Sequence, residues 1–260
     1  QKYNLDEEML RPYFALENVR SGVFFLANRL YGITFRPIVV PVYHPEVTAF
    51  EVLDADESHL GVLYFDFFPR EGKGQGAWCG NYVEQTYRDG ERVAPVVSIV
   101  ANFTRPTGDN PALLTLDEVE TLFHEFGHAL HFLFHDVKYR GLSEVEGDFV
   151  ELPSQVMENW AFNPEVLKQY AVHYRTGDVM PEALMAKIAR SELFNQGFMT
   201  TELIAASLSD TDIHSMTEYA PFDPMEFERK VLNEKRGLIP QIEPRYRYPY
   251  FSHIFDGGYS

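Results

Sequence analysis

The sequence predicts a mainly α-helical protein with a small, mostly antiparallel β-sheet that precedes a helix carrying the pattern H-E-x-x-H. Capped stripes of apolar residues at helical spacing occur on both sides of a central region. Within residues 36–103, short runs rich in Val, Ile, Tyr and Phe alternate with Pro, Gly, Asp and Asn, which is typical of strands joined by short turns. The H-E-x-x-H pattern follows at residues 124–128.

Residues 1–35 are predicted to be a helical lead-in to this sheet. Over residues 6–31, Asp6 can cap a helix, Pro12 marks a break or kink, and Gly32 is a stop signal. An apolar stripe on this helix is expected to face the core, and its members are Val19, Val23, Leu26, Ala27 and Leu30.

Residues 36–105 are predicted to form the small sheet. The candidate strands are residues 38–43, 49–53, 61–68, 77–85 and 93–103. Residues 70–76 resemble a phosphate-binding loop but lack the order G-x-x-x-x-G-K-[ST], so we interpret them as a mobile turn. Residues 76–85 are a candidate surface for a substrate, because an extended peptide can add a strand to a sheet edge.

Residues 112–260 are predicted to be mainly helical, after a loop at residues 106–111. Thr115 and Glu118 form a capping box at the start of the H-E-x-x-H helix. Pro153 is tolerated only near a helix start, which places Glu151 in the first turn of its helix or just before it. The further helices are expected at residues 148–162, 165–175, 181–194, 196–208 and from Asp223 onward, with a loop at 139–147 and an aromatic, glycine-rich segment at 245–260.

The composition is that of an ordinary globular chain, with 260 residues, 45% of them hydrophobic and 23% charged. Cys79 is the only cysteine, so no disulfide can form within the chain, and this suits a reducing compartment such as the cytoplasm. The sequence has no apolar run of about 18 residues, which predicts that it does not span a membrane. The net charge of −17 argues against nucleic acid as a partner, because nucleic-acid binding needs basic patches.

The H-E-x-x-H pattern has a direct chemical interpretation. On a helix, His124 and His128 lie on one face with Cβ atoms about 5–6 Å apart, so both imidazoles can bind one Zn²⁺. Glu125 lies beside such a metal and can take a proton from a water molecule there. A catalytic zinc keeps three protein ligands. The candidates for the third are His131, His135, Asp136, Glu144, Glu146, Asp148, Glu151 and Glu158.

A ligand on a neighbouring helix is held better than one on a loop, which favours Glu151 or Glu158. These two residues lie two turns apart on one helix face, and their spacing alone does not choose between them.

Several stretches together resemble the thimet oligopeptidase and bacterial peptidyl-dipeptidase family of zinc metallopeptidases. They are residues 122–131 (LFHEFGHALH), 148–155 (DFVELPSQ), 158–160 (ENW), 65–73 (FDFFPREGK), 100–104 (VANFT), 194–198 (FNQGF), 251–255 (FSHIF) and 257–259 (GGY). The resemblance spans nearly the whole chain, and within the family the chain looks most like the bacterial peptidyl-dipeptidases.

The resemblance implies a zincin-like catalytic domain over residues 1–260 that binds one Zn²⁺. It implies a general base, two residues that contact the substrate and the developing oxyanion, and two glutamates that accept hydrogen bonds from the ligand imidazoles or their neighbours. The metal ligands would be His124, His128 and Glu151, the base Glu125, the substrate contacts His253 and Tyr259, and the supporting glutamates Glu158 and Glu120.

The implied activity is zinc-dependent hydrolysis of short peptides, with release of C-terminal dipeptides. The family is longer at its N-terminus and continues past the glycine-rich segment, so we expect an internal fragment whose partners are short peptides and the remainder of the parent polypeptide. Two alternatives stay open: an endo-acting oligopeptidase of the same family, and a non-catalytic zinc-binding fragment of a larger enzyme.

Overall fold

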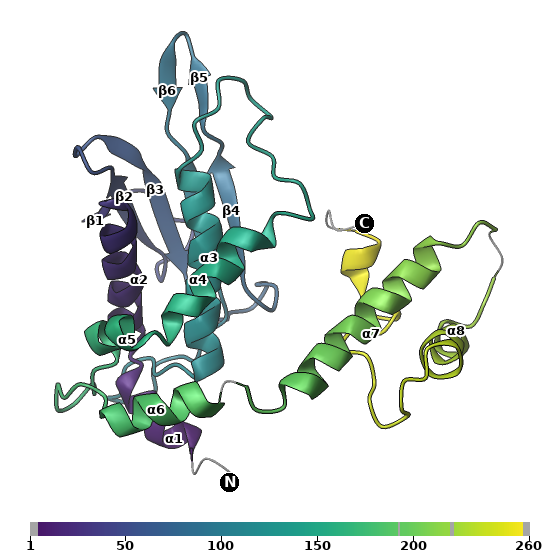
Figure 1. The fold of residues 1–260 in the computed structure, drawn as a ribbon. Coiled ribbons are helices and arrows are strands. Elements are labelled where there is room, and N and C mark those ends of the chain that lie inside the picture. Colours follow the sequence, from purple (N-terminus) through teal and green to yellow (C-terminus); the bar gives the residue numbers. More distant parts are fainter. Residues whose placement is uncertain (1–4, 192, 219–220, 257–260) are drawn as a thin grey trace. The chain divides into compact units, whose positions relative to one another are not determined.

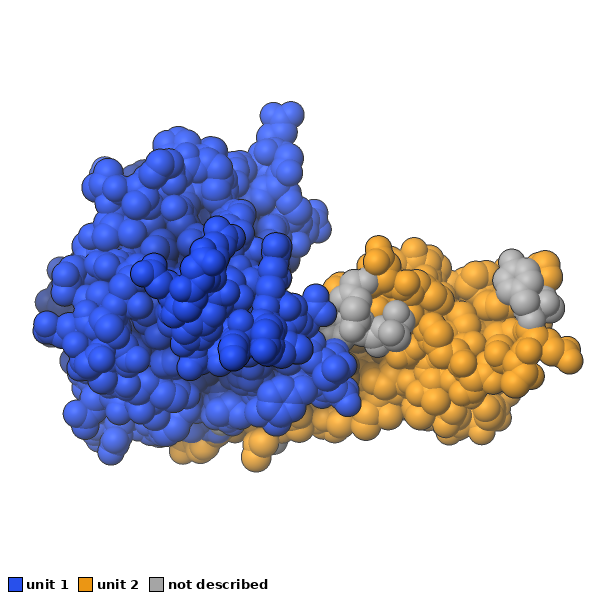
Figure 2. Space-filling view, turned by 90° about the horizontal axis from the view of Figure 1, so that it is seen from above, with its two compact units in different colours: residues 1–189 blue, residues 190–260 orange. Residues whose placement is uncertain are grey.

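The computed structural model describes residues 5–191, 193–218 and 221–256. The chain divides into two compact units, Gln1–Ala189 and Arg190–Ser260, which are coloured separately in Figure 2. The organisation as one catalytic domain over residues 1–260 stays a prediction. Among the described residues, none of the helices combines the length and the apolar character that a bilayer crossing needs.

The first unit is built on a mixed five-stranded sheet with the strand order β1-β2-β3-β7-β4. Its strands are β1 (Thr34–Ile38), β2 (Thr48–Leu53), β3 (His59–Asp66), β4 (Trp78–Val83) and β7 (Val96–Val100). Neighbouring strands are antiparallel except β3 and β7, which are parallel. A separate hairpin consists of β5 (Thr86–Arg88) and β6 (Glu91–Val93). The small, mostly antiparallel sheet ahead of the H-E-x-x-H helix is therefore confirmed.

Helices cover one face of this sheet (Figure 1). The helices that begin in the first unit are α1 (Glu7–Leu10), α2 (Leu16–Tyr31), α3 (Leu116–Leu133), α4 (Glu151–Ala161), α5 (Pro164–Tyr170) and α6 (Glu182–Ser191), with a 3₁₀ turn at Arg11–Tyr13. Phe24 of α2 has its ring centroid 5.9 Å from that of Phe65 in β3 and 6.3 Å from that of Phe126 in α3. Phe65 and Phe126 are fully buried. These aromatic rings join α2, the sheet and α3 into one hydrophobic core.

The second unit contains α7 (Gln196–His214) and α8 (Pro224–Arg229), which continues as a π-helical segment, Lys230–Lys235. A 3₁₀ turn follows at Ser252–Ile254. Asp223 caps α8 as predicted, because its carboxylate accepts hydrogen bonds from the backbone N–H groups of Met225 and Glu226, both at 2.9 Å. A small core of Ala205, Val231 and Leu232 holds this unit together.

Three details of the sequence interpretation were wrong. The strand expected at residues 38–43 lies earlier, at Thr34–Ile38, and it contains Pro37, which an edge strand tolerates because that edge needs no further N–H donor. The segment 93–103 holds the end of β6 and all of β7 instead of one strand. Leu30 was expected in the core but is 41% exposed near the end of α2.

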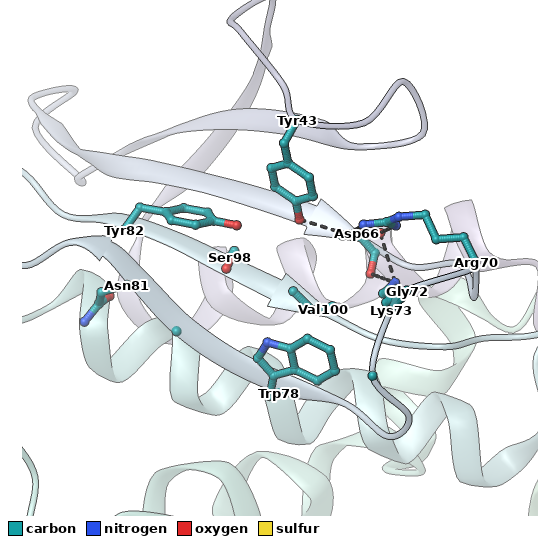
Figure 3. Close-up of a pocket in the computed structure, with 12 residues that line it drawn as sticks. Tyr43, Asp66, Arg70, Gly72, Lys73, Trp78, Asn81, Tyr82, Ser98 and Val100 are labelled. Atoms are coloured by element: carbon teal, nitrogen blue, oxygen red, sulfur yellow. Dashed lines mark hydrogen bonds and ion pairs between the residues drawn. The ribbon is translucent and has the colours of Figure 1, made fainter.

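The opposite face of the sheet carries a buried ionic cluster centred on Asp66 (Figure 3). Arg70 donates to both carboxylate oxygens of Asp66 at 2.6 and 2.7 Å, and Tyr43 donates to it at 2.9 Å. The ammonium of Lys73 is 2.9 Å from Asp66 Oδ1 and also donates to the carbonyls of Asp66, Phe68 and Ala101. Although burial opposes it, these hydrogen bonds lower the pKa of Asp66 to about 2.

The cluster anchors the segment that leads into β4. Lys73 links the end of β3 to the residue after β7, and Asn102 donates to the carbonyls of Gly74 and Gly76, both at 2.8 Å. The sequence predicted only a mobile turn at residues 70–76 and did not predict these bonds. They fix where the edge strand β4 begins.

Candidate metal centre

The helix α3 begins where its capping box predicts. Thr115 accepts a hydrogen bond from the backbone N–H of Glu118 at 3.1 Å, and Glu118 accepts one from the backbone N–H of Thr115 at 2.9 Å. Caps of this kind contribute about 0.5–2 kcal/mol to helix stability. The apolar face of α3 packs on the sheet, which turns the two histidines toward α4 instead.

Three side chains converge at this place. The Nε2 atoms of His124 and His128 each lie 3.2 Å from Glu151 Oε2, and their ring centroids are 5.0 Å apart. In the part of the chain that the structure describes, this is the one group of three His, Cys, Asp or Glu donors within 4.8 Å of one another. Burial lowers the pKa of His128, which keeps this imidazole in its neutral, metal-binding form. Two imidazole nitrogens and a carboxylate oxygen can hold a divalent transition metal.

Glu151 reaches the histidines because it is the first residue of α4. This agrees with the position that Pro153 predicted for it. Ser154, which is fully buried, places its hydroxyl 2.8 Å from the carbonyl oxygen of Glu151 and 2.8 Å from its Oε2. Sequence reasoning missed Ser154, although its spacing of three residues from Glu151 puts both on one face of the helix. The hydroxyl therefore helps to orient the carboxylate.

Glu158 lies on the other side of His124. Its Oε1 is 2.6 Å from His124 Nδ1, while the Nε2 of the same ring points to Glu151. A carboxylate behind an imidazole fixes the ring orientation and directs the remaining nitrogen to the metal. The structure thus separates the two glutamates that spacing alone could not: Glu151 lies among the donors, and Glu158 lies behind one of them.

Glu125 is buried beside the three donors, with 5% of its surface exposed. Its Oε2 is a buried oxygen without a hydrogen-bond partner among the described residues. Burial raises the pKa of Glu125 to about 7; the charge of Glu151 adds to this effect, and His124 opposes it. A carboxylate with a pKa near neutrality can both accept and return a proton at neutral pH.

Gly127 allows α4 to approach α3 closely enough for Glu151 to join the histidines. A Cβ at this position would lie 2.6 Å from the carbonyl oxygen of Pro153 and 2.6 Å from the Cα of Ser154. Both atoms belong to the backbone of α4, which cannot move aside as a flexible side chain can. An isolated glycine inside a helical pattern was the available sequence signal, because such a glycine often has a packing reason.

We expect the substitution Gly127→Ala to displace the first turn of α4 and with it Glu151. Overpacking of this kind costs about 1–3 kcal/mol of stability, and zinc affinity should fall as well. The matched control is Gly22→Ala, whose Cβ would lie 2.6 Å from the Tyr170 ring in the contact between α2 and α5. Thermal unfolding and zinc titration should show both variants destabilised but only Gly127→Ala weakened in zinc binding. Unchanged zinc affinity in Gly127→Ala would contradict this account.

Three further residues were predicted at the site, namely Glu120, His253 and Tyr259. Glu120 is exposed on α3, one turn before His124. His253 lies in the 3₁₀ turn of the second unit. Tyr259 falls outside the described residues. The roles expected for Glu120, His253 and Tyr259 stay predictions.

The arrangement on α3 and α4 is that of a metallopeptidase. The chain belongs to peptidase family M3, since the model of that family matches residues 1–260. This confirms the resemblance seen in the sequence motifs.

Some similar proteins are named dipeptidyl carboxypeptidase and others oligopeptidase A. Dipeptidyl carboxypeptidase of Salmonella typhimurium is 46% identical over 265 residues and covers 100% of the chain. Oligopeptidase A of the same species is 38% identical and covers 99% of the chain. Organellar oligopeptidase A of Arabidopsis thaliana is 37% identical and covers 100% of the chain. The chain spans 39% of the length of each bacterial relative and 34% of the plant one.

Proposed function

We propose that the protein is a zinc-dependent peptidase with a zincin-like catalytic region over residues 1–260, and that it acts on short peptides. The observation that carries the proposal is the convergence of His124, His128 and Glu151 beside the buried carboxylate of Glu125. The two nitrogen donors and one oxygen donor suit Zn²⁺ and leave a position for water or substrate. A cytoplasmic location is part of the same proposal, and it rests on the lone cysteine.

The roles of the protein side chains follow from their positions. Zinc, when bound, polarises the scissile carbonyl and makes a water molecule a stronger acid. Glu125 accepts the proton of this water and later gives it to the leaving amine, which its pKa of about 7 favours. Glu158 holds His124 in place through Nδ1. By resemblance to the family, His253 and Tyr259 donate hydrogen bonds to the oxyanion.

Release of C-terminal dipeptides is the more specific part of the proposal. It is supported by 46% identity to a protein named dipeptidyl carboxypeptidase. The alternative is endo-acting cleavage within short peptides, which the 38% identity to oligopeptidase A keeps open.

One assay tests these proposals together. Activity is measured on a short peptide with a free C-terminus and on the same peptide with an amidated C-terminus, and products are identified by mass spectrometry. Treatment with a chelator should abolish hydrolysis, and added Zn²⁺ should restore it. Dipeptide release that requires the free C-terminus supports the proposal, whereas equal internal cleavage of both peptides identifies the endo-acting alternative. Stoichiometric zinc without hydrolysis of either peptide would identify a non-catalytic zinc-binding chain.

We further propose that the peptide substrate aligns along β4. This strand is an edge of the five-stranded sheet and packs against α3. Its residue Cys79 is half-buried. Burial raises the pKa of its thiol and the charge of Glu125 adds to this effect, so the strand passes close to the candidate base. Backbone groups along the edge can pair with an extended peptide.

A structure with a bound peptide inhibitor should therefore show main-chain hydrogen bonds between the peptide and residues 78–83. A peptide bound at the metal without any such bond would refute this alignment and leave the metal site itself unaffected.

A further inference from the structure

A second pair of imidazoles lies at the C-terminal end of α3. His131 and His135 are four residues apart, and their ring centroids are 5.0 Å apart with an interplanar angle of 72°. The pair His124 and His128 has the same centroid separation of 5.0 Å and an angle of 80°. A pair of imidazoles with the same ring separation therefore recurs at the end of α3, with His131 inside the helix and His135 two residues beyond its last residue, Leu133.

The second pair is suited to accept a cation. His135 Nδ1 is buried and has no hydrogen-bond partner among the described residues, whereas buried polar atoms normally have one. Burial lowers the pKa of both His131 and His135, so both rings are neutral and can offer a nitrogen lone pair at neutral pH. Neutral imidazole is a preferred ligand of Zn²⁺, Cu²⁺ and Ni²⁺.

The backbone around the pair is held by long-range bonds. Arg92 of β6 donates to the carbonyl of His135 at 3.3 Å, and Gln85 accepts a hydrogen bond from the backbone N–H of Val137 at 2.6 Å. These two bonds hold the backbone of His135 and Val137 in place although α3 ends at Leu133.

Two acidic residues bear on the pair. The charge of Glu84, between β4 and β5, opposes the lowering of the His135 pKa that burial causes. The other nearby acid, Asp136, accepts a hydrogen bond from Tyr87 at 2.9 Å. Glu84, His131 and His135 do not bring three donor atoms within 4.8 Å of one another, so water would supply the remaining ligands of an ion held by the two imidazoles.

We propose that His131 and His135 bind a second divalent transition-metal ion through their two imidazoles, with water as the remaining ligands. This site binds more weakly than the first, because only the first brings three donors within 4.8 Å among the described residues. Repulsion between two cations adds to the difference, since His131 follows His128 by one helical turn. The proposal concerns ion binding and does not depend on peptidase activity.

The test is metal stoichiometry. The protein is dialysed against increasing Zn²⁺, and bound metal is measured by atomic absorption. The unsubstituted protein should bind one ion tightly and a second at higher concentration. His135→Asn and His131→Asn should each weaken the second binding step by more than about tenfold. Loss of a residue that only supports a ligand already costs about 10–100-fold in metal affinity, and these residues are the ligands themselves. Both variants should bind the first ion as tightly as the unsubstituted protein. Glu151→Ala should weaken binding of the first ion and leave binding of the second unchanged.

A matched control is His59→Asn, which replaces an exposed histidine of β3 that contacts Glu51. This variant should bind both ions. The proposal is overturned if the unsubstituted protein takes up only one ion over the whole range, if His131→Asn and His135→Asn both retain the second ion, or if His59→Asn loses it too.

Discussion

Replacement of Glu125 by glutamine is expected to lower kcat by about 10²–10⁴-fold, the range typical of losing a general acid–base group, while zinc stays bound. The amide has nearly the shape of the carboxylate but cannot take up a proton. Because Glu125 lies beside the three donors and not among them, the substitution removes no ligand. Steady-state kinetics on one peptide, with zinc content measured in the same preparations, would give the result.

The control for this experiment is Asp117→Asn, the same acid-to-amide change at an exposed position in the first turn of α3. It should leave kcat within the error of the unsubstituted protein. A Glu125→Gln variant that contains stoichiometric zinc and turns over at the normal rate would show that another group acts as the base.

The second large effect concerns zinc affinity. Glu151→Ala removes one of three direct donors, and its loss in affinity should exceed the loss in Glu158→Ala. Supporting partners of this kind typically contribute about 10–100-fold to metal affinity, which sets the expected size for Glu158→Ala. Both substitutions shorten a glutamate on α4 by the same atoms, so each serves as the matched control for the other.

Competition with a chelating indicator of known affinity would rank the two variants. The opposite order, with Glu158→Ala the weaker binder, would mean that Glu158 supplies the third donor. The sequence spacing of Glu151 and Glu158 could not tell which of them supplies the third donor, because both residues lie on one face of the helix.

Local signals explain why much of the helical part could be predicted from the sequence. The capping box at Thr115, the glycine at position 32 and the cap at Asp223 each determine a helix end through neighbouring residues alone. The H-E-x-x-H spacing likewise lies within one helix, so it predicts how His124 and His128 meet without knowledge of the fold.

The features that were missed depend on residues far apart in the sequence. The parallel pairing of β3 with β7 requires the whole intervening segment to cross back, and no local pattern encodes it. Gly127 matters only because the backbone at Pro153 meets it. A residue that is ordinary in its own segment, such as Gly127, therefore matters for the site through a partner that the sequence does not reveal.

The four carbonyl and carboxylate oxygens around Lys73 also affect how the segment ahead of the edge strand β4 can open. Since one ammonium joins the end of β3, Phe68 and the residue after β7, this segment cannot open without separating the Lys73 ammonium from Asp66. Local opening of such a region requires more free energy than the fraying of an ordinary edge. Amide hydrogens of the segment 67–76 should therefore exchange slowly with solvent, and proteases should cut it poorly, even though its glycines give it the composition of a flexible linker.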